Sequence, residues 1–253
     1  MTGRLAIVGL GPGGAMLRTP QAEAALAAAS DLVGYDRDLD RVPERPEQRR
    51  HASADGAELD RARLALMLAA GGRRVAVVSG GDAGVFGMAN ALFEAIEQGE
   101  PAWRGVDVEV VPGISAAFAA AARIGAPLGH DFCVLSLSGN LKSWEGVSLR
   151  LTAAATAGFV LALYNPASRA RPWQLGAAFA LLRNVLPGET PVVFATAISQ
   201  PDERLTMTTL AAADPARADM RTLVLIGSSR TRLIARGNGR PFVYTPRSAG
   251  TLS

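Results

Sequence analysis

Residues 73–84 read Arg-Arg-Val-Ala-Val-Val-Ser-Gly-Gly-Asp-Ala-Gly, an apolar run that ends in a glycine-rich turn with one acidic residue. Such a run, bounded by polar residues and glycine, predicts a buried β-strand over residues 73–79. The glycines on both sides of Asp82 let bare backbone and a carboxylate meet a ligand at close range. Apolar residues at helical spacing follow at 85–98, so the segment predicts a strand, a turn and a helix in succession.

The same alternation extends in both directions along the chain. Thr19 and Pro20 supply a helix N-cap and a first-turn proline, and Gly71-Gly72 ends a helical pattern. Repeated strand–helix alternation is typical of a mostly parallel sheet with helices on its faces. The predicted strands are 4–8, 32–35, 73–79, 106–111, 132–137, 159–164, 191–196 and 223–226, and the predicted helices are 20–29, 59–70, 85–98, 114–124, 146–155 and 174–186.

One glycine- and proline-containing segment interrupts this alternation. Residues 125–129 read Gly-Ala-Pro-Leu-Gly, a composition that breaks regular structure. We therefore predict an α/β fold of two domains, 1–125 and 126–246, with mostly parallel or mixed sheets. The tail after Asn238 contains Pro241 and Pro246 and is expected to be frayed.

The composition excludes several classes of protein. Of 253 residues, 49% are hydrophobic and 19% are charged, which suits a folded protein. One Cys and two His argue against a metal site, so none is predicted. The net charge is +3, and the basic residues are scattered without interleaved aromatics, so no nucleic-acid binding is expected. No apolar run reaches the roughly 18 residues of a membrane span, and a cytoplasmic protein without a membrane partner is expected.

The first glycine-rich turn, residues 9–14, reads Gly-Leu-Gly-Pro-Gly-Gly and follows the first predicted strand. A turn of this kind suggests a dinucleotide site, because glycine lets the backbone approach a pyrophosphate. However, Pro12 removes one N–H donor, and the next helix starts only at Thr19. A nicotinamide-dependent oxidoreductase therefore stays as an alternative.

Three further turns follow predicted strands, where a parallel sheet places its ligands. Taken together, the order and spacing of all four motifs resemble the tetrapyrrole methylase family, whose members depend on S-adenosylmethionine. The resemblance covers residues 4–236. The four motifs are Gly-Leu-Gly-Pro-Gly at 9–13, Ser-Gly-Gly-Asp-Ala-Gly at 79–84, Val-Pro-Gly-Ile-Ser-Ala at 111–116 and Tyr-Asn-Pro at 164–166.

This resemblance implies the tetrapyrrole methylase fold, in which two α/β domains form a cofactor cleft, and a homodimer. It implies S-adenosylmethionine as the cofactor and S-adenosylhomocysteine as its product. It also places Gly11 near the substrate. The residues that it implies for cofactor binding are Pro12, Gly80, Gly81, Asp82, Val85, Ser115, Ala116, Asn165 and Ala197.

Further segments distinguish among family members. They resemble the members that methylate precorrin-3B at carbon 17, with contraction of the macrocycle to precorrin-4. One departure is Gly139, where relatives often carry Asp. Whether the substrate is metal-free or carries cobalt stays open, as do methylation at another position, uroporphyrinogen III as substrate, and a precorrin carrier without activity. The segments are 33–35, 125–133, 137–142 and 219–222.

The ring-contracting chemistry implied by the resemblance needs a group that transfers protons. His51 lies in a charged stretch that suggests a surface position, so His130 at the domain junction is the catalytic candidate, with a packed structural role as the alternative. Precorrins carry eight carboxylate side arms, which call for cationic contacts. Lys142, Arg169 and Arg171 follow predicted strands and are the candidates for substrate binding.

Overall fold

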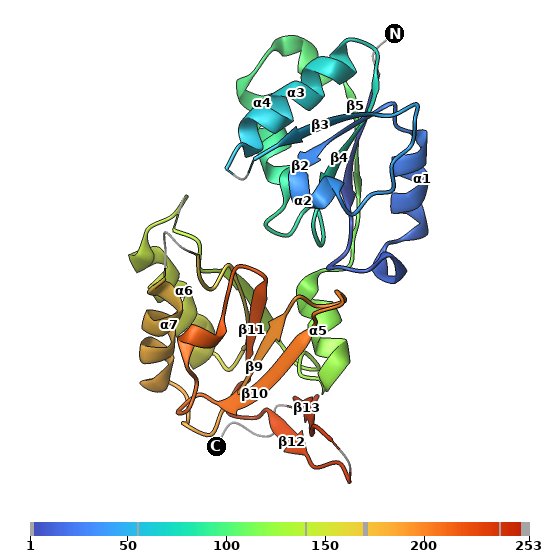
Figure 1. The fold of residues 1–253 in the computed structure, drawn as a ribbon. Helices are drawn as coiled ribbons and strands as arrows, with labels where there is room; N and C mark the ends of the chain where they lie inside the picture. The colour runs from blue at the N-terminus through green and yellow to red at the C-terminus, as the bar shows by residue number, and fades with distance from the viewer. Residues whose placement is uncertain (1–2, 55, 140, 169–171, 238, 249–253) are drawn as a thin grey trace. The chain divides into compact units, whose positions relative to one another are not determined.

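The structure is a computed structural model that describes residues 3–54, 56–139, 141–168, 172–237 and 239–248. The chain divides into two compact units, Met1–Ala116 and Ala117–Ser253, which are described separately (Figure 1).

The first unit contains a five-stranded sheet in which all neighbouring strands are parallel. The strand order is β3-β2-β4-β1-β5. In the register, Gly9 pairs with Ser79 and Val8 with Val111, so the carboxyl ends of β1, β4 and β5 meet at one edge. The strands are β1 (Arg4–Gly9), β2 (Asp31–Tyr35), β3 (Arg49–Ser53), β4 (Arg74–Ser79) and β5 (Asp107–Val111).

Helices cover both faces of this sheet (Figure 1). Successive strand residues point to opposite faces. Accordingly, Ile7 is buried with α3 (Glu58–Ala70) and α4 (Met88–Gln98), and Val8 with α1 (Pro20–Ala28). The Thr19 hydroxyl accepts a hydrogen bond from the Ala22 N–H at 3.1 Å and caps α1, as its sequence position predicts. Shorter elements are α2 (Asp36–Leu39) and the 3₁₀ turns Ala15–Leu17 and Pro101–Gly105.

The second unit contains a mixed sheet in the order β10-β9-β11-β8-β7. Strands β7 (Phe132–Ser136) and β8 (Val160–Tyr164) are parallel, whereas β11 (Thr222–Ile226) runs antiparallel to β8 and β9. Helices α6 and α7 bury one face of this sheet in an apolar core. The remaining elements of this layer are α6 (Trp144–Thr156), α7 (Gln174–Arg183), β9 (Pro191–Thr196), β10 (Arg204–Thr209) and the 3₁₀ turn Pro215–Arg217.

A small third sheet joins β6 (Gly125–Ala126), β12 (Arg232–Ile234) and β13 (Phe242–Tyr244) in the order β12-β13-β6. Val243 and Thr245 are buried, and the Thr245 hydroxyl donates to the Pro127 carbonyl at 2.6 Å. The expectation of a frayed tail is therefore wrong for residues 242–245, because β13 pairs with strands on both sides.

The fold class is confirmed as α/β with a parallel and a mixed sheet. The two units divide after Ala116, whereas the sequence predicts a boundary after Gly125. Helix α5 (Ala116–Ile124) accounts for the difference, because its residues from Ala117 onward belong to the second unit. Its Ala117 N–H donates to the Tyr164 hydroxyl at 2.9 Å, and the Arg123 guanidinium meets the Glu203 carboxylate at 3.1 Å.

Among the described residues, every helix is too short or too polar to span a bilayer. No group of three or more His, Cys, Asp or Glu side chains among these residues is arranged to hold a metal ion.

Candidate functional site

The carboxyl edge of the first sheet brings three loops together. Strands β1 and β4 are neighbours at the centre of the sheet. After β1 the chain continues to β2, toward one edge strand of the sheet, whereas after β4 it continues to β5, at the opposite side of the sheet. This reversal is a topological switch point, where open α/β sheets bind ligands. The loops that meet there are residues 10–14, 80–87 and 112–115.

The first two loops are joined through their backbones. The Gly11 N–H donates to the Gly81 carbonyl at 3.0 Å, and the Gly81 N–H donates to the Gly11 carbonyl at 2.9 Å. The third loop lies against both of them, because a Cβ atom on Gly113 would lie 2.2 Å from the Gly81 oxygen and 2.8 Å from the Gly9 carbonyl carbon. Only glycine permits such an approach of backbone to backbone.

The Asp82 carboxylate connects the second loop to the third. Its Oδ1 accepts from the Gly84 N–H at 2.8 Å, and its Oδ2 accepts from the Gly113 N–H at 3.0 Å. Each carboxylate oxygen retains further acceptor capacity, so these bonds leave Asp82 able to accept from a ligand. The acidic residue singled out in the sequence therefore organises the loops themselves.

Open space adjoins this backbone at Gly81. Gly81 has φ +68°, and a Cβ atom built on it would meet nothing within 4 Å. Pro12 and Val85 are half-buried and Ser115 is buried in the neighbouring loops. The combination of bare backbone, one carboxylate and free space fits a nucleoside-type group bound through main-chain contacts.

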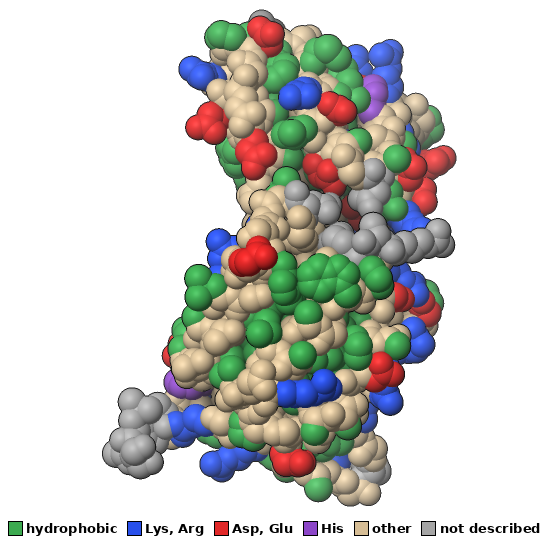
Figure 2. Space-filling model, turned by 90° about the vertical axis from the view of Figure 1, so that its left-hand side faces the viewer, with side chains coloured by type: hydrophobic (Ala, Val, Ile, Leu, Met, Phe, Trp, Pro, Cys, Tyr) green, Lys and Arg blue, Asp and Glu red, His purple; other side chains and the backbone are tan. Residues whose placement is uncertain are grey.

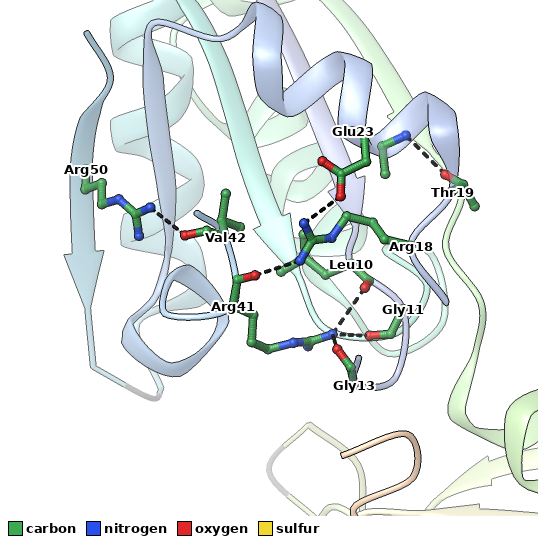
Figure 3. Close-up of polar contacts among 10 residues, drawn as sticks. Leu10, Gly11, Gly13, Arg18, Thr19, Glu23, Arg41, Val42 and Arg50 are labelled. Atoms are coloured by element: carbon green, nitrogen blue, oxygen red, sulfur yellow. Dashed lines mark hydrogen bonds and ion pairs between the residues drawn. The ribbon is translucent and has the colours of Figure 1, made fainter. Parts of the chain in front are cut away.

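Two charged residues that the sequence analysis did not identify support these loops. The Arg41 Nη2 donates to the carbonyls of Gly11 at 2.6 Å and of Leu10 and Gly13 at 3.2 Å each (Figure 3). The Asp38 Oδ2 accepts from the Gly80 N–H at 3.2 Å, and its Oδ1 accepts from Arg41 at 3.3 Å. Both residues come from the polar stretch after β2. The loops that they contact are far away in the sequence, so local patterns do not reveal this role.

Burial affects both members of this pair. It raises the pKa of the Asp38 carboxyl, although the charge of Arg41 and the hydrogen bond from Gly80 oppose the rise. It also lowers the pKa of the Arg41 guanidinium, against the attraction of Asp38. Each charge thus offsets the desolvation of the other.

A second group of predicted residues lies at the carboxyl edge of the second sheet. Asn165 follows β8, and its amide donates to the Ser136 hydroxyl at the end of β7, at 2.9 Å. Ala197 follows β9, and its N–H donates to the Arg221 carbonyl at 3.1 Å. Asn165 and Ala197 have φ values of +51° and +52°. Non-glycine residues in this conformation are strained, and such strain is concentrated at functional sites.

Helices α6 and α7 begin at this same edge. Trp144 and Trp173 lie edge to face there with ring centroids 5.0 Å apart, and Leu141 and Trp173 are exposed. Figure 2 shows hydrophobic side chains gathered on the side of the second unit where α6 and α7 lie in Figure 1. Lys142 is half-buried beside them, and its pKa is lowered by burial and by the charge of Arg150. Arg169 and Arg171 lie outside the described residues.

The structure does not bring His130 together with these residues. His130 precedes β7, at the amino edge of the second sheet, whereas Ser136 and Asn165 lie at its carboxyl edge. The five residues of β7 separate the two edges by about 16 Å. The catalytic role of His130 stays a prediction. Gly11 is buried, and its N–H and carbonyl are both engaged, so a substrate contact there also stays a prediction.

Glycine-rich loops at a switch point are typical of α/β proteins that bind nucleotide-like ligands. The chain belongs to the Tetrapyrrole (Corrin/Porphyrin) Methylases, a family that matches residues 4–214. It is 56% identical over 247 residues to a Precorrin-3B C(17)-methyltransferase of Sinorhizobium sp, covering 98% of this chain and 97% of the relative. It is also 37% identical to a probable cobalt-factor III C(17)-methyltransferase of Salmonella typhimurium, over 90% of this chain and 93% of the relative.

Among solved structures, the methyltransferase CobJ superposes with a TM-score of 0.92. The match has 46% sequence identity and covers 97% of this chain and 100% of the other. The predicted family and the enzyme class of methyltransferase are thereby confirmed. The alternative class, a nicotinamide oxidoreductase, does not fit this membership.

Proposed function

We propose that the protein transfers a methyl group from S-adenosylmethionine to carbon 17 of precorrin-3B, with ring contraction to precorrin-4, in cobalamin biosynthesis. The observation that carries this proposal is the 56% identity, over nearly the full length of both chains, to a relative of that printed name. The glycine-rich loops of the first unit and the surface where α6 and α7 begin also support it.

The residues at the carboxyl edge of the first sheet fit the methyl donor, which the family uses. When bound, the donor supplies an electrophilic methyl group and leaves as S-adenosylhomocysteine. The backbones at Pro12, Gly80 and Gly81 would hold it, with Asp82 as an acceptor. Val85, Ser115 and Ala116 would complete these contacts, and Asn165 and Ala197 of the second unit are further proposed contacts. Fixed orientation of the reacting groups supplies much of the catalysis in such a transfer.

The edge formed by α6 and α7 fits a macrocycle with acidic side arms. Exposed Leu141 and Trp173 offer apolar contact, and Lys142 offers a cation to a carboxylate. Arg169 and Arg171, which follow β8 in the sequence, are proposed as additional cations. This surface supports a tetrapyrrole as the substrate rather than a small metabolite.

A cobalt-containing substrate is the second candidate. The Salmonella relative, which is named for cobalt-factor III, is 37% identical, whereas the relative named for precorrin-3B is 56% identical. The higher identity favours the metal-free substrate.

The test is incubation of the purified protein with S-adenosylmethionine and either precorrin-3B or cobalt-factor III. Mass spectrometry is expected to show one added methyl group on precorrin-3B, and NMR is expected to locate it at carbon 17. Methylation at another position would refute the regiochemistry and leave the family intact. Tight tetrapyrrole binding without consumption of the donor would instead indicate a carrier.

The proposal includes a cytoplasmic homodimer that binds neither nucleic acid nor a membrane. The family resemblance supports the dimer, and the scattered basic residues with a net charge of only +3 argue against nucleic acid. Light scattering of the purified protein tests the assembly, and a monomeric mass at assay concentrations would contradict it. Gel-shift and vesicle-sedimentation assays test the two other partners.

A further inference from the structure

Arg41 follows α2, and its guanidinium contacts the glycine-rich loop of residues 10–14. Packing of α2 alone does not require these contacts. One nitrogen, Nη2, donates to the carbonyls of Leu10, Gly11 and Gly13. Because loop 10–14 contains three glycines, its backbone has many accessible conformations and needs an external constraint to keep one of them. A single guanidinium that binds three carbonyls supplies this constraint.

The same arginine reaches the second loop through Asp38. The Asp38 carboxylate accepts from Arg41 through Oδ1 and from the Gly80 N–H through Oδ2. Loops 10–14 and 80–87 are therefore held from one side by an ion pair, in addition to the backbone pairing of Gly11 with Gly81. The Arg41–Asp38 pair joins the two loops that flank the open space at Gly81.

A buried arginine, Arg18, positions the half-buried Arg41. The Arg18 side chain is 2% exposed, and its Nη2 donates to the Arg41 carbonyl at 2.6 Å while its Nη1 meets the Glu23 carboxylate at 2.8 Å (Figure 3). The Arg41 Nε is buried without a hydrogen-bond partner among the described residues. A buried donor left unpaired costs stability, and the hydrogen bonds of Arg41 to the loops must offset this cost.

We propose that Arg41, together with Asp38, is a positioning residue that fixes loops 10–14 and 80–87 in the conformation that binds the methyl donor. This inference rests on the proposed function. Arg41 acts through the loop backbone: without it, the donor must order the loops on binding, and its affinity falls by the free energy of that ordering.

Arg50 provides a matched control. Its Nη1 donates to the Leu39 carbonyl at 2.8 Å and its Nη2 to the Val42 carbonyl at 2.6 Å, so it also holds the backbone around α2. None of the hydrogen bonds found for Arg50 involves the glycine loops. Substitution of either arginine by Met removes main-chain hydrogen bonds near α2, but Arg41→Met alone releases loop 10–14.

The experiment measures S-adenosylhomocysteine binding by calorimetry for wild type, Arg41→Met, Arg41→Lys and Arg50→Met. We expect Kd to rise about tenfold or more in Arg41→Met, because one or more loop residues must then be ordered on binding. Arg41→Lys should recover part of the affinity, since an ammonium can donate to some of the carbonyls. Arg50→Met should stay within about twofold of wild type while its Tm falls.

Hydrogen exchange of the ligand-free proteins gives a second readout. Exchange in residues 9–14 and 80–87 should accelerate in Arg41→Met and not in Arg50→Met. In steady-state assays, the KM for the donor should rise more than kcat falls. If Arg41→Met does not fold, Asp38→Asn serves in its place, with faster exchange at 80–87 and weaker binding expected.

Three results would overturn the inference. They are a wild-type Kd in Arg41→Met, unchanged loop exchange in that variant, or equal weakening of binding by Arg50→Met, which would indicate a general structural effect. Failure of the wild-type protein to bind S-adenosylhomocysteine would refute the proposed function and the inference together. The two failures are therefore distinguishable.

Discussion

Individual glycines determine how closely the loops of the candidate site approach one another. At Gly113 a Cβ atom would meet the Gly81 carbonyl oxygen and the Gly9 backbone, both of which are main-chain groups that cannot rotate away. The glycines of this edge therefore have a steric function that goes beyond turn formation. The sequence predicts that glycine backbone approaches a ligand closely, but it does not predict the approach of Gly113 to Gly9 and Gly81, because these loops are far apart along the chain.

Gly113→Ala is expected to separate the third loop from the first two. Overpacking of this kind costs about 1–3 kcal/mol, and donor affinity should fall by about tenfold or more as the loops move apart. Calorimetry with S-adenosylhomocysteine and thermal unfolding measure the two effects. Gly105→Ala is the control, because nothing lies within 4 Å of its added Cβ. Equal donor affinity in the two variants would contradict the steric argument.

Asp82→Asn tests the carboxylate that connects the second and third loops. An amide presents one oxygen and one NH₂ group, so one of the two N–H donors at Gly84 and Gly113 loses its acceptor. We expect a loss of about 1–3 kcal/mol in unfolding free energy, together with weaker donor binding. Asp60→Asn, at an exposed carboxylate on α3, should change stability by less than about 0.5 kcal/mol. Chemical denaturation compares the two, and a stable Asp82→Asn variant with full affinity would refute the linking role.

At the scale of elements, the alternating apolar runs predicted the buried strands and most helices to within a few residues. Strand β3 was missed because Arg49–Ser53 contains no apolar run, and β10 was missed because its residues are only half-buried. The strand order β3-β2-β4-β1-β5 depends on pairing between distant segments, which local patterns do not encode. For the same reason, the loops of the site were predictable one by one, whereas Arg41 and Asp38 were not.

Strand β2 begins with a buried acid whose ionisation stabilises the amino edge of the first sheet. Burial of the Asp31 carboxyl raises its pKa, but hydrogen bonds from Arg73, His51 and Ser30 outweigh this effect and lower the pKa to about 2. Because the folded-state pKa lies below the ordinary value of 3.8, the ionised group stabilises the fold at pH values above about 4. This contribution is lost progressively as the pH falls from about 4 toward 2.

Asp31→Asn is therefore expected to destabilise the protein by about 2 kcal/mol at pH 7. The difference from wild type should shrink to roughly half at pH 3, since protonation then removes much of the wild-type advantage. Urea denaturation at pH 7, 4 and 3 measures this trend. A difference that is independent of pH over this range would show that packing, rather than the carboxylate charge, accounts for the effect.

At the scale of the whole molecule, the amino-acid composition excludes several kinds of catalytic chemistry but does not by itself identify the reaction. A chain with one Cys, two His and one Lys among 253 residues offers few groups for acid–base or metal chemistry. The sequence places His130 at the start of a strand, and the fold adds that Ser136 and Asn165 lie at the opposite edge of the same sheet. By contrast, transfer from an activated methyl donor needs orientation above all, which the interlocked loops of the proposed donor site would supply.

Donor contacts are proposed in both units of the chain, so ligand binding should slow hydrogen exchange in both. Saturation with S-adenosylhomocysteine should slow hydrogen exchange in residues 9–14, 80–87 and 112–116 of the first unit and in residues 164–166 and 196–199 of the second. At 100 times Kd the ligand adds about 2.7 kcal/mol to the unfolding free energy, so Tm should rise as well. Mass spectrometry resolves these segments, with α3 as an internal reference that lies outside the proposed contacts. Protection limited to the first unit would remove Asn165 and Ala197 from the donor site, because strained residues with a ligand role should lose mobility when the ligand binds.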